Sequence, residues 1–282
     1  MPTNYADIHP ASQAFEVSVL SFPSALERRD RITRMFAELP DCDWKFFDVV
    51  PADELSVRYD EEAAFRSYGS ILSAAERSCA ASHIAMLETW LADGRTQYLV
   101  VMEDDLLIDP NFSIGPMINF MDLCQVHYLK LYARFFVPAH FIANIGRQLF
   151  YRASWPALGT QCYIVSREGA LQLTGHIRET GLLASIDMTF DRFWETGVPV
   201  TLAYPFPLLE MANGSSIHTS RATIHQRNRE LREKIGERTQ WQRLREKLAR
   251  HRADRAMRQF DAALRQRIAV HQNALYDPLN AI

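Results

Sequence analysis

The sequence predicts an α/β fold with a mostly parallel sheet flanked by helices and followed by a helical C-terminal extension. Three observations support this prediction. Strand-like and helix-like stretches alternate through the first 218 residues, one apolar run ends in three adjacent acids, and the composition changes after residue 218. Such alternation is typical of parallel sheets, because parallel neighbours need a crossover connection. With 282 residues, 48% of them hydrophobic, the chain can bury a full core.

The first half of the chain supplies three strands separated by two helices. Apolar and β-branched runs predict the strands, and apolar residues at three- or four-residue spacing predict the helices. These are a strand at Phe15–Ser21, a helix at Pro23–Leu39, a strand at Trp44–Val50, a helix at Ser73–Ala92 and a strand at Tyr98–Met102. Ser73 and Glu76 are spaced as a capping box for the second helix, and Gly94 fits its end.

Two more apolar strands continue this order. They are expected at Gln125–Tyr132 and Thr160–Ser166, and a helix at Glu168–Thr174 follows the second. Neither an internal repeat nor a low-complexity stretch interrupts the pattern. We therefore expect residues 1–218 to form the main domain.

Residues 219–282 are expected to form a basic helical extension. Residues 1–218 carry 16 Lys and Arg against 27 Asp and Glu, a net charge of −11, whereas residues 219–272 carry 15 against 6, or +9. Apolar residues recur here at helical spacing, as at Trp241, Leu244 and Leu248, so each helix has an apolar face to bury. Three burial sites stay open: the main domain, a membrane surface with anionic lipids, and a homodimer. Nucleic acid is disfavoured, because acids interrupt the basic run and no DNA-binding motif is present.

Residue usage predicts a cytoplasmic protein, peripheral at the inner face of the cell membrane if the extension binds lipid. No window approaches the roughly 18 uninterrupted apolar residues of a membrane span, and the first twenty residues do not resemble an export signal. The four cysteines stand singly among apolar neighbours and are expected to be reduced: Cys42, Cys79, Cys124 and Cys162.

Three consecutive carboxylates, Glu103, Asp104 and Asp105, follow the strand that ends at Met102. Open α/β sheets bind ligands at the carboxyl ends of their strands. Adjacent carboxylates repel one another, and oxygen ligands favour Mg²⁺ or Mn²⁺, which often share their coordination with substrate phosphates. A divalent-cation site and a solvated acidic turn both fit this pattern. No dinucleotide-binding or P-loop glycine motif is present.

Six blocks follow one another along about residues 15–218: VSVLSFPSALERRDRI, WKFFDVV, SAAERSCAASHIAMLETW, LVVMEDDLLI, GTQCYIVSREGALQL and ASIDMTFDRFW. Their order and spacing resemble glycosyltransferase family 25, the bacterial lipooligosaccharide galactosyltransferase type. The resemblance implies a GT-A-like α/β fold, a UDP-sugar donor, and Mn²⁺ or Mg²⁺ held by a DxD-type motif. In this chain Glu103 and Asp105 would bind the metal, and His218 would complete its coordination.

The resemblance also implies a base for the acceptor hydroxyl, as an inverting transferase needs one. Asp187 and Asp191 are the candidate catalytic residues, and Asp187 matches the family's aspartate. They are four residues apart and share one face if this stretch is helical. A helix cap and a surface acid are the plainer interpretation of the same pair.

Donor-binding residues are expected among the same blocks. The set is Arg28, Asp48, Glu76, Ser82, His83, Glu103 and Asp104. His83, on an apolar helix, fits a buried core histidine equally well. The aromatic-rich segment 133–158 predicts the acceptor side, because sugar rings stack on aromatic faces. Tyr132, Arg134 and Trp155 flank or lie in it.

The sequence thus predicts a metal-dependent, inverting glycosyltransferase that transfers a hexose to a lipooligosaccharide or another surface glycan. The expected hexose is galactose, with UDP-galactose as the donor. Two alternatives remain at this point. A metal-dependent nucleotidyl or phosphoryl transferase would use the same acids without a sugar pocket. A non-catalytic binding protein would act through the basic helices alone.

Overall fold

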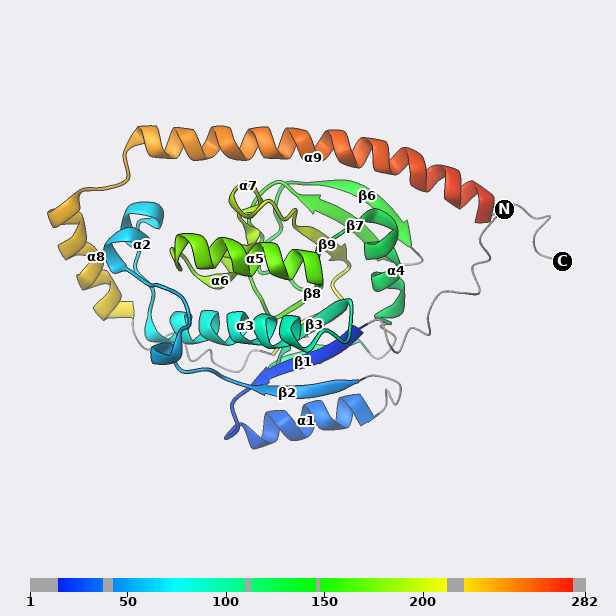
Figure 1. The fold of residues 1–282 in the computed structure, drawn as a ribbon, viewed down its shortest axis with the longest axis horizontal. Coiled ribbons are helices and arrows are strands. Elements are labelled where there is room, and N and C mark those ends of the chain that lie inside the picture. The colour runs from blue at the N-terminus through cyan, green and yellow to red at the C-terminus, as the bar shows by residue number, and fades with distance from the viewer. Residues whose placement is uncertain (1–14, 38–42, 110–112, 146–147, 212–220, 276–282) are drawn as a thin grey trace.

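One eight-stranded sheet forms the centre of the molecule (Figure 1). This computed structural model describes residues 15–37, 43–109, 113–145, 148–211 and 221–275. The strand order is β2–β1–β3–β8–β5–β9–β7–β6. The strands of this sheet are β1 Phe15–Ser21, β2 Trp44–Asp48, β3 Tyr98–Glu103, β5 Tyr128–Lys130, β6 Ala139–Ile145, β7 Gln148–Ala153, β8 Cys162–Ser166 and β9 Thr201–Tyr204. A separate antiparallel pair consists of β4 Leu106–Ile108 and β10 Leu208–Glu210.

Helices cover the sheet on both faces. They are α1 Leu26–Ala37, α2 Glu61–Tyr68, α3 Ala74–Asp93, α4 Gly115–Cys124, α5 Arg167–Thr180, α6 Ile186–Asp191, α7 Phe193–Thr196, α8 Arg221–Ile235 and α9 Gln240–Leu275, with a 3₁₀ turn η3 at Ala52–Glu54. Six of the eight strands point the same way, since only β8 and β7 run against their neighbours. The predicted α/β class with a mostly parallel sheet is confirmed.

The alternation of side chains along the strands divides the core into two layers. In β3, Val100 and Met102 lie in a cluster with residues of α1 and α4. Leu99 and Val101, on the other face, pack with residues of α3, α5 and α6. Because both faces are covered, β3 is a continuous apolar run, as its sequence indicates.

Local signals predict several boundaries well. Strand β1 has the predicted bounds, and Ser73 and Glu76 form the predicted capping box at the start of α3. Gly94 ends α3 with a left-handed φ of 72°. Helix α1 begins at Leu26, after the turn that contains Pro23, rather than at Pro23.

The region around residues 113–158 differs more from the prediction. The expected strand at Gln125–Tyr132 is shortened to β5, because Gln125 ends helix α4 in a left-handed conformation with φ 51°. The apolar residues of α4 do recur at helical spacing, but the helix was not predicted. Strands β6 and β7 pair antiparallel, and a bulge between Phe141 and Ala143 interrupts the period-two pattern by which a strand is recognised.

The C-terminal helices fold back on the main domain. In α8, Leu231 packs with Phe65 and Ile71. Helix α9 runs along the β6–β7 side of the sheet, and its Leu264 joins the core cluster of α1 and α4 (Figure 1). The main domain therefore buries part of their apolar surface, one of the three burial sites considered. None of the described helices is long and apolar enough to cross a membrane.

A buried ion network ties α9 to the sheet. Asp261 of α9 is 0% exposed and accepts hydrogen bonds from Arg152 of β7, at 3.1 and 3.2 Å, and from His140 Nε2 of β6, at 2.8 Å. Arg152 also donates to Thr201 of β9. Removing one partner of a buried pair leaves the other charge uncompensated.

We therefore expect Asp261→Ala to lower the free energy of unfolding by about 3 to 5 kcal/mol, as is typical for a broken buried pair. Urea unfolding followed by circular dichroism measures it. Asp30→Ala, which breaks an exposed pair with Arg34 on α1, serves as the control and should leave the unfolding midpoint unchanged. Equal effects of the two substitutions would contradict this role of Asp261.

Candidate functional site

Strand direction brings several predicted residues to one edge of the sheet. β1, β2 and β3 are parallel, so their carboxyl ends lie together, and these ends carry Ser21, Asp48 and Glu103. β8 runs the opposite way, so Gly159 and Thr160, which precede it, reach the same edge. The main-chain N–H of Glu103 donates to the carbonyl of Gln161, at 2.8 Å.

Arg28 neutralises one of the three consecutive acids. The Asp104 carboxylate is 6% exposed and accepts hydrogen bonds from Arg28 Nη1, at 3.0 Å, and from the Ser21 hydroxyl, at 2.7 Å. Arg31 donates to the Asp104 carbonyl at 2.6 Å. The structure thus brings Arg28 and Asp104 together, but as partners of each other.

Asp105 lies among like charges. Its pKa is raised from 3.8 to about 6. Desolvation is the main cause, the carboxylates of Glu103, Glu210 and Asp104 also raise the pKa, and Arg28 opposes the rise. Its Oδ1 is buried and has no hydrogen-bond partner among the described residues. An unpaired carboxylate oxygen in such a group is the arrangement expected of a ligand for a divalent cation. The unpaired Asp105 oxygen is therefore an atom of the type that Mn²⁺ or Mg²⁺ takes as a ligand.

Asp187 holds the loop before β8. Its Oδ2 accepts from the Gly159 N–H, at 3.0 Å, and its Oδ1 from the Met188 N–H, at 2.7 Å. Desolvation acts to raise the pKa of Asp187, but hydrogen bonds from Ser185 and Gly159 and the charge of Lys130 outweigh it, and the pKa is lowered. Asp187 is therefore ionised at neutral pH.

Asp191 is enclosed in the core. Both of its oxygens accept from the buried Lys130 ammonium, at 2.9 and 3.0 Å, and Oδ2 also accepts from the N–H groups of Ala157 and Leu158. Asp191 and Lys130 are both 0% exposed. With its oxygens fully engaged, Asp191 is placed to position the 157–159 loop, whereas Asp187 lies beside Gly159 at its end.

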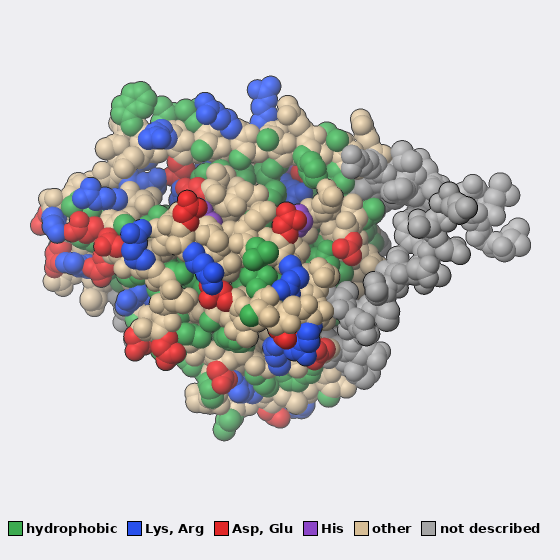
Figure 2. All heavy atoms as spheres, viewed as in Figure 1, with side chains coloured by type: hydrophobic (Ala, Val, Ile, Leu, Met, Phe, Trp, Pro, Cys, Tyr) green, Lys and Arg blue, Asp and Glu red, His purple; other side chains and the backbone are tan. Residues whose placement is uncertain are grey.

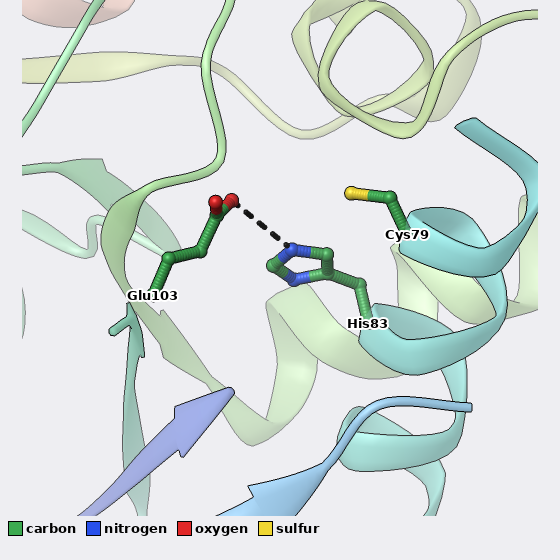
Figure 3. Close-up of side chains that lie close together, drawn as sticks. All are labelled: Cys79, His83 and Glu103. Atoms are coloured by element: carbon green, nitrogen blue, oxygen red, sulfur yellow. Dashed lines mark ion pairs between the residues drawn. The ribbon is translucent and has the colours of Figure 1, made fainter. Parts of the chain in front are cut away.

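Cys79, His83 and Glu103 form a second group at this edge (Figure 3). Cys79 and His83 lie on consecutive turns of α3 and point toward Glu103 at the end of β3. His83 Nε2 is 3.8 Å from Glu103 Oε1, and the Thr160 hydroxyl lies 3.4 Å from the same oxygen. Burial raises the pKa of the Cys79 thiol, and the carboxylates of Glu103 and Asp187 raise it further.

Three of the predicted donor residues have other local partners. Glu76 forms the capping box of α3, accepting from the Ser73 main-chain N–H at 2.7 Å. Ser82 is fully buried and accepts from the Val50 N–H at 2.8 Å, which joins α3 to the segment after β2. Asp48 is exposed and pairs with Arg29.

The predicted acceptor residues lie in two places. The Tyr132 hydroxyl donates to Glu210, whose charge contributes to the raised pKa of Asp105, so Tyr132 is linked to the acidic group through Glu210. The neighbouring Arg134 is exposed, with its main-chain N–H bonded to Leu158. The Trp155 ring instead contacts α9, where the Arg250 guanidinium lies 3.6 Å from the ring centroid. His218, predicted as a metal ligand, lies outside the described residues.

Four residues of this edge were not predicted: Cys79, Lys130, Thr160 and Glu210. Cys79 and Thr160 lie within the sequence blocks quoted above, but those blocks alone predict no role in the site for either residue. Glu210 is the last residue of β10, a short strand with a weak pattern. This strand pairs with β4, which directly follows the acidic triplet, so only the fold places Glu210 there.

The sequence model of glycosyltransferase family 25, described as an LPS biosynthesis protein family, matches residues 15–194. The chain belongs to glycosyltransferase family 25. All the residues discussed above up to Asp191 lie in the matched range, so this edge of the sheet is the candidate active site of a glycosyltransferase family member.

No curated protein matches the chain in sequence. Among solved structures, a glycosyltransferase involved in glycosylation of the major capsid of PBCV-1 is 11% identical and has a TM-score of 0.42, with coverage of 78% of this chain and 99% of that one. A197 from STIV is 11% identical, with a TM-score of 0.39 and coverage of 72% and 96%. A mutant Drosophila β1,4-galactosyltransferase 7, in complex with manganese, UDP-Gal and xylobiose, is 12% identical, with a TM-score of 0.35 and coverage of 74% and 79%. Because these TM-scores are low, we take neither substrate nor mechanism from them.

Asp105 and Asp187 should affect stability with opposite signs. Because the pKa of Asp105 is raised in the native state, the native state loses stability as the pH rises through about 6. Because the pKa of Asp187 is lowered, the stability that ionised Asp187 contributes is lost as the pH falls. In metal-free protein at pH 7.5, Asp105→Asn should raise the free energy of unfolding by about 1 to 2 kcal/mol, an advantage that fades toward pH 4. Asp187→Asn should lower it.

Urea unfolding in the presence of EDTA, repeated from pH 4 to pH 8, measures both effects. A loss of stability in Asp105→Asn at pH 7.5 would contradict the crowding of like charges around this carboxylate.

Proposed function

We propose that the protein is a metal-dependent, inverting hexosyltransferase that uses a UDP-sugar, with UDP-galactose as the first donor to test, and a surface glycan such as lipooligosaccharide as acceptor. The observation that carries this proposal is the unpaired Asp105 oxygen among Glu103, Asp104 and Glu210 in a family 25 chain. A nucleotidyl transferase would also need such acids, but membership of a glycosyltransferase family favours glycosyl transfer.

Glu103 and Asp105 are the residues that would hold Mn²⁺ or Mg²⁺, and the negative charge of Glu210 would add to the attraction for a cation at Asp105. Such a cation neutralises charge on the oxygens of a diphosphate leaving group. Arg28 keeps Asp104 paired, so that the remaining carboxylates are available to the cation. A bound dication would also remove the repulsion that raises the pKa of Asp105.

Asp187 is the proposed base. It is ionised at neutral pH and lies beside Gly159 and Thr160, the segment that meets Glu103. A carboxylate in this state can accept the proton of an acceptor hydroxyl as that oxygen attacks. Asp191 positions the same loop through Ala157 and Leu158.

Calorimetry with UDP and Mn²⁺ tests the metal site. We expect coupled binding to the unaltered protein and at least a tenfold weakening in Asp105→Ala, since the unpaired ligand is lost. Glu179→Ala, which removes an exposed carboxylate of α5, is the control and should bind normally. Unaltered binding by Asp105→Ala would refute the site.

Turnover of a panel of UDP-sugars with a simple glycan acceptor tests the reaction. Asp187→Asn should reduce transfer by about a hundredfold or more, the usual contribution of a general base, while UDP and Mn²⁺ still bind. The same panel identifies the donor sugar. Undiminished turnover in Asp187→Asn would remove this residue from the mechanism.

We also propose that the outward face of α9 binds anionic lipid at the inner face of the cell membrane, where a lipid-linked acceptor is presented. Trp241, Leu244 and Leu248 are 75%, 43% and 47% exposed, and helical spacing places Arg245, Arg252 and Arg255 on the same side. Figure 2 shows exposed hydrophobic and Lys or Arg side chains side by side along the edge where Figure 1 places α9. Apolar residues bordered by arginine suit an anionic membrane surface.

Point substitutions test this better than truncation, because α9 completes the core. Leu244→Gln combined with Trp241→Ser and Leu248→Gln should reduce sedimentation with phosphatidylglycerol vesicles at least tenfold. Leu171→Gln, at an exposed leucine of α5, is the control. If the triple variant sediments like the unaltered protein, the lipid proposal fails.

A further inference from the structure

The group of Cys79, His83 and Glu103 has a different ligand chemistry from the acids around Asp105. One ligand atom from each residue lies within 4.8 Å of the other two (Figure 3). Thiolate and imidazole are the ligands that Zn²⁺ prefers, whereas Mn²⁺ and Mg²⁺ prefer oxygen. The proposed donor-metal site would use Glu103 and Asp105 but neither Cys79 nor His83.

The His83 ring has one nitrogen free to bind a cation and the other held by a neighbouring side chain. Its ring is 0% exposed, and Nε2 is buried without a hydrogen-bond partner among the described residues, although it faces Glu103. The other nitrogen, Nδ1, lies 3.0 Å from the Tyr163 hydroxyl. Metal-binding histidines commonly have their second nitrogen fixed by such a contact, with its N–H donated to an oxygen. An unpaired buried nitrogen is costly unless something binds it.

The distances between the three ligand atoms match those around tetrahedral Zn²⁺ after a small movement of the side chains. Tetrahedral Zn²⁺ with bonds of about 2.0 to 2.3 Å holds its ligand atoms about 3.3 to 3.6 Å apart. His83 Nε2 and Glu103 Oε1 are already 3.8 Å apart. Cys79 lies one turn before His83 on helix α3, so both side chains point toward Glu103 from the same side of the helix.

We propose that Cys79, His83 and Glu103 form a site for a thiophilic divalent cation, of which Zn²⁺ is the biological example. On binding, the Cys79 thiol gives its proton to solvent, and its sulfur, His83 Nε2 and a Glu103 oxygen each form a bond to the cation. One thiolate, one carboxylate and a neutral imidazole balance the charge of a dication, which suits a largely buried site. Water takes the fourth position.

Glu103 is shared between the two sites, and this gives the proposal a regulatory consequence. A cation held by Cys79 and His83 draws Glu103 toward α3 and away from Asp105. This consequence rests on the proposed function, because it assumes that Glu103 helps to hold the donor metal. Zn²⁺ at this group would then oppose the binding of UDP with Mn²⁺.

Titration of the full-length protein with Co²⁺ tests the site directly, because a thiolate bound to Co²⁺ gives an intense near-ultraviolet charge-transfer band. We expect the unaltered protein to develop this band with one equivalent of Co²⁺ and to lose it when Zn²⁺ is added. Cys79→Ala should not develop the band and should bind Zn²⁺ at least tenfold more weakly. Cys124→Ala, which alters a buried cysteine of α4, is the matched control and should keep the band.

Absence of the band in the unaltered protein, or its persistence in folded Cys79→Ala, would overturn the site. Circular dichroism confirms that each variant is folded. A second titration measures UDP and Mn²⁺ binding with one equivalent of Zn²⁺, where we expect at least tenfold weakening in the unaltered protein and none in Cys79→Ala. If no UDP binds even without Zn²⁺, the proposed function fails while the Co²⁺ band still decides the site.

Discussion

Repulsion between carboxylates at the end of β3 is the constraint around which the candidate site is arranged. Parallel strands deliver Glu103, Asp104 and Asp105 to one edge, and β10 adds Glu210. The fold neutralises only one of these charges, because Arg28 forms an ion pair with Asp104. The remaining repulsion raises the pKa of Asp105, and it is the repulsion that a cation at the proposed site would remove on binding.

A second interaction holds the 157–159 loop in place at this edge of the sheet. The buried pair of Lys130 and Asp191 holds the main chain at Ala157 and Leu158, and Leu158 adopts a left-handed φ of 56° that leucine rarely takes. Such a conformation persists only where surrounding contacts enforce it. The ion pair in the core therefore determines where Gly159 meets Asp187 and where Thr160 meets Glu103.

The sequence predicted the elements with strong local signals and missed those set by distant contacts. The capping box of α3 and the apolar run of β3 are local, and both were predicted. The antiparallel pair β6–β7 was missed because its pattern is interrupted by a bulge and its stability depends on α9. Likewise, Asp187 and Asp191 look equivalent in sequence. Contacts distant in sequence distinguish them, since Asp191 accepts from Lys130, Ala157 and Leu158 whereas Asp187 accepts from Gly159.

The position of α9 also bears on how the chain avoids association with itself. β6 is the last strand of the sheet, and an exposed edge strand offers unpaired main-chain groups to other chains. Helix α9 packs along β6, and Arg265 donates to the Phe141 carbonyl at 3.4 Å. The C-terminal helix thus shields an edge that would otherwise template intermolecular β-pairing. A chain that ended before it would be prone to aggregate rather than remain as a smaller working enzyme.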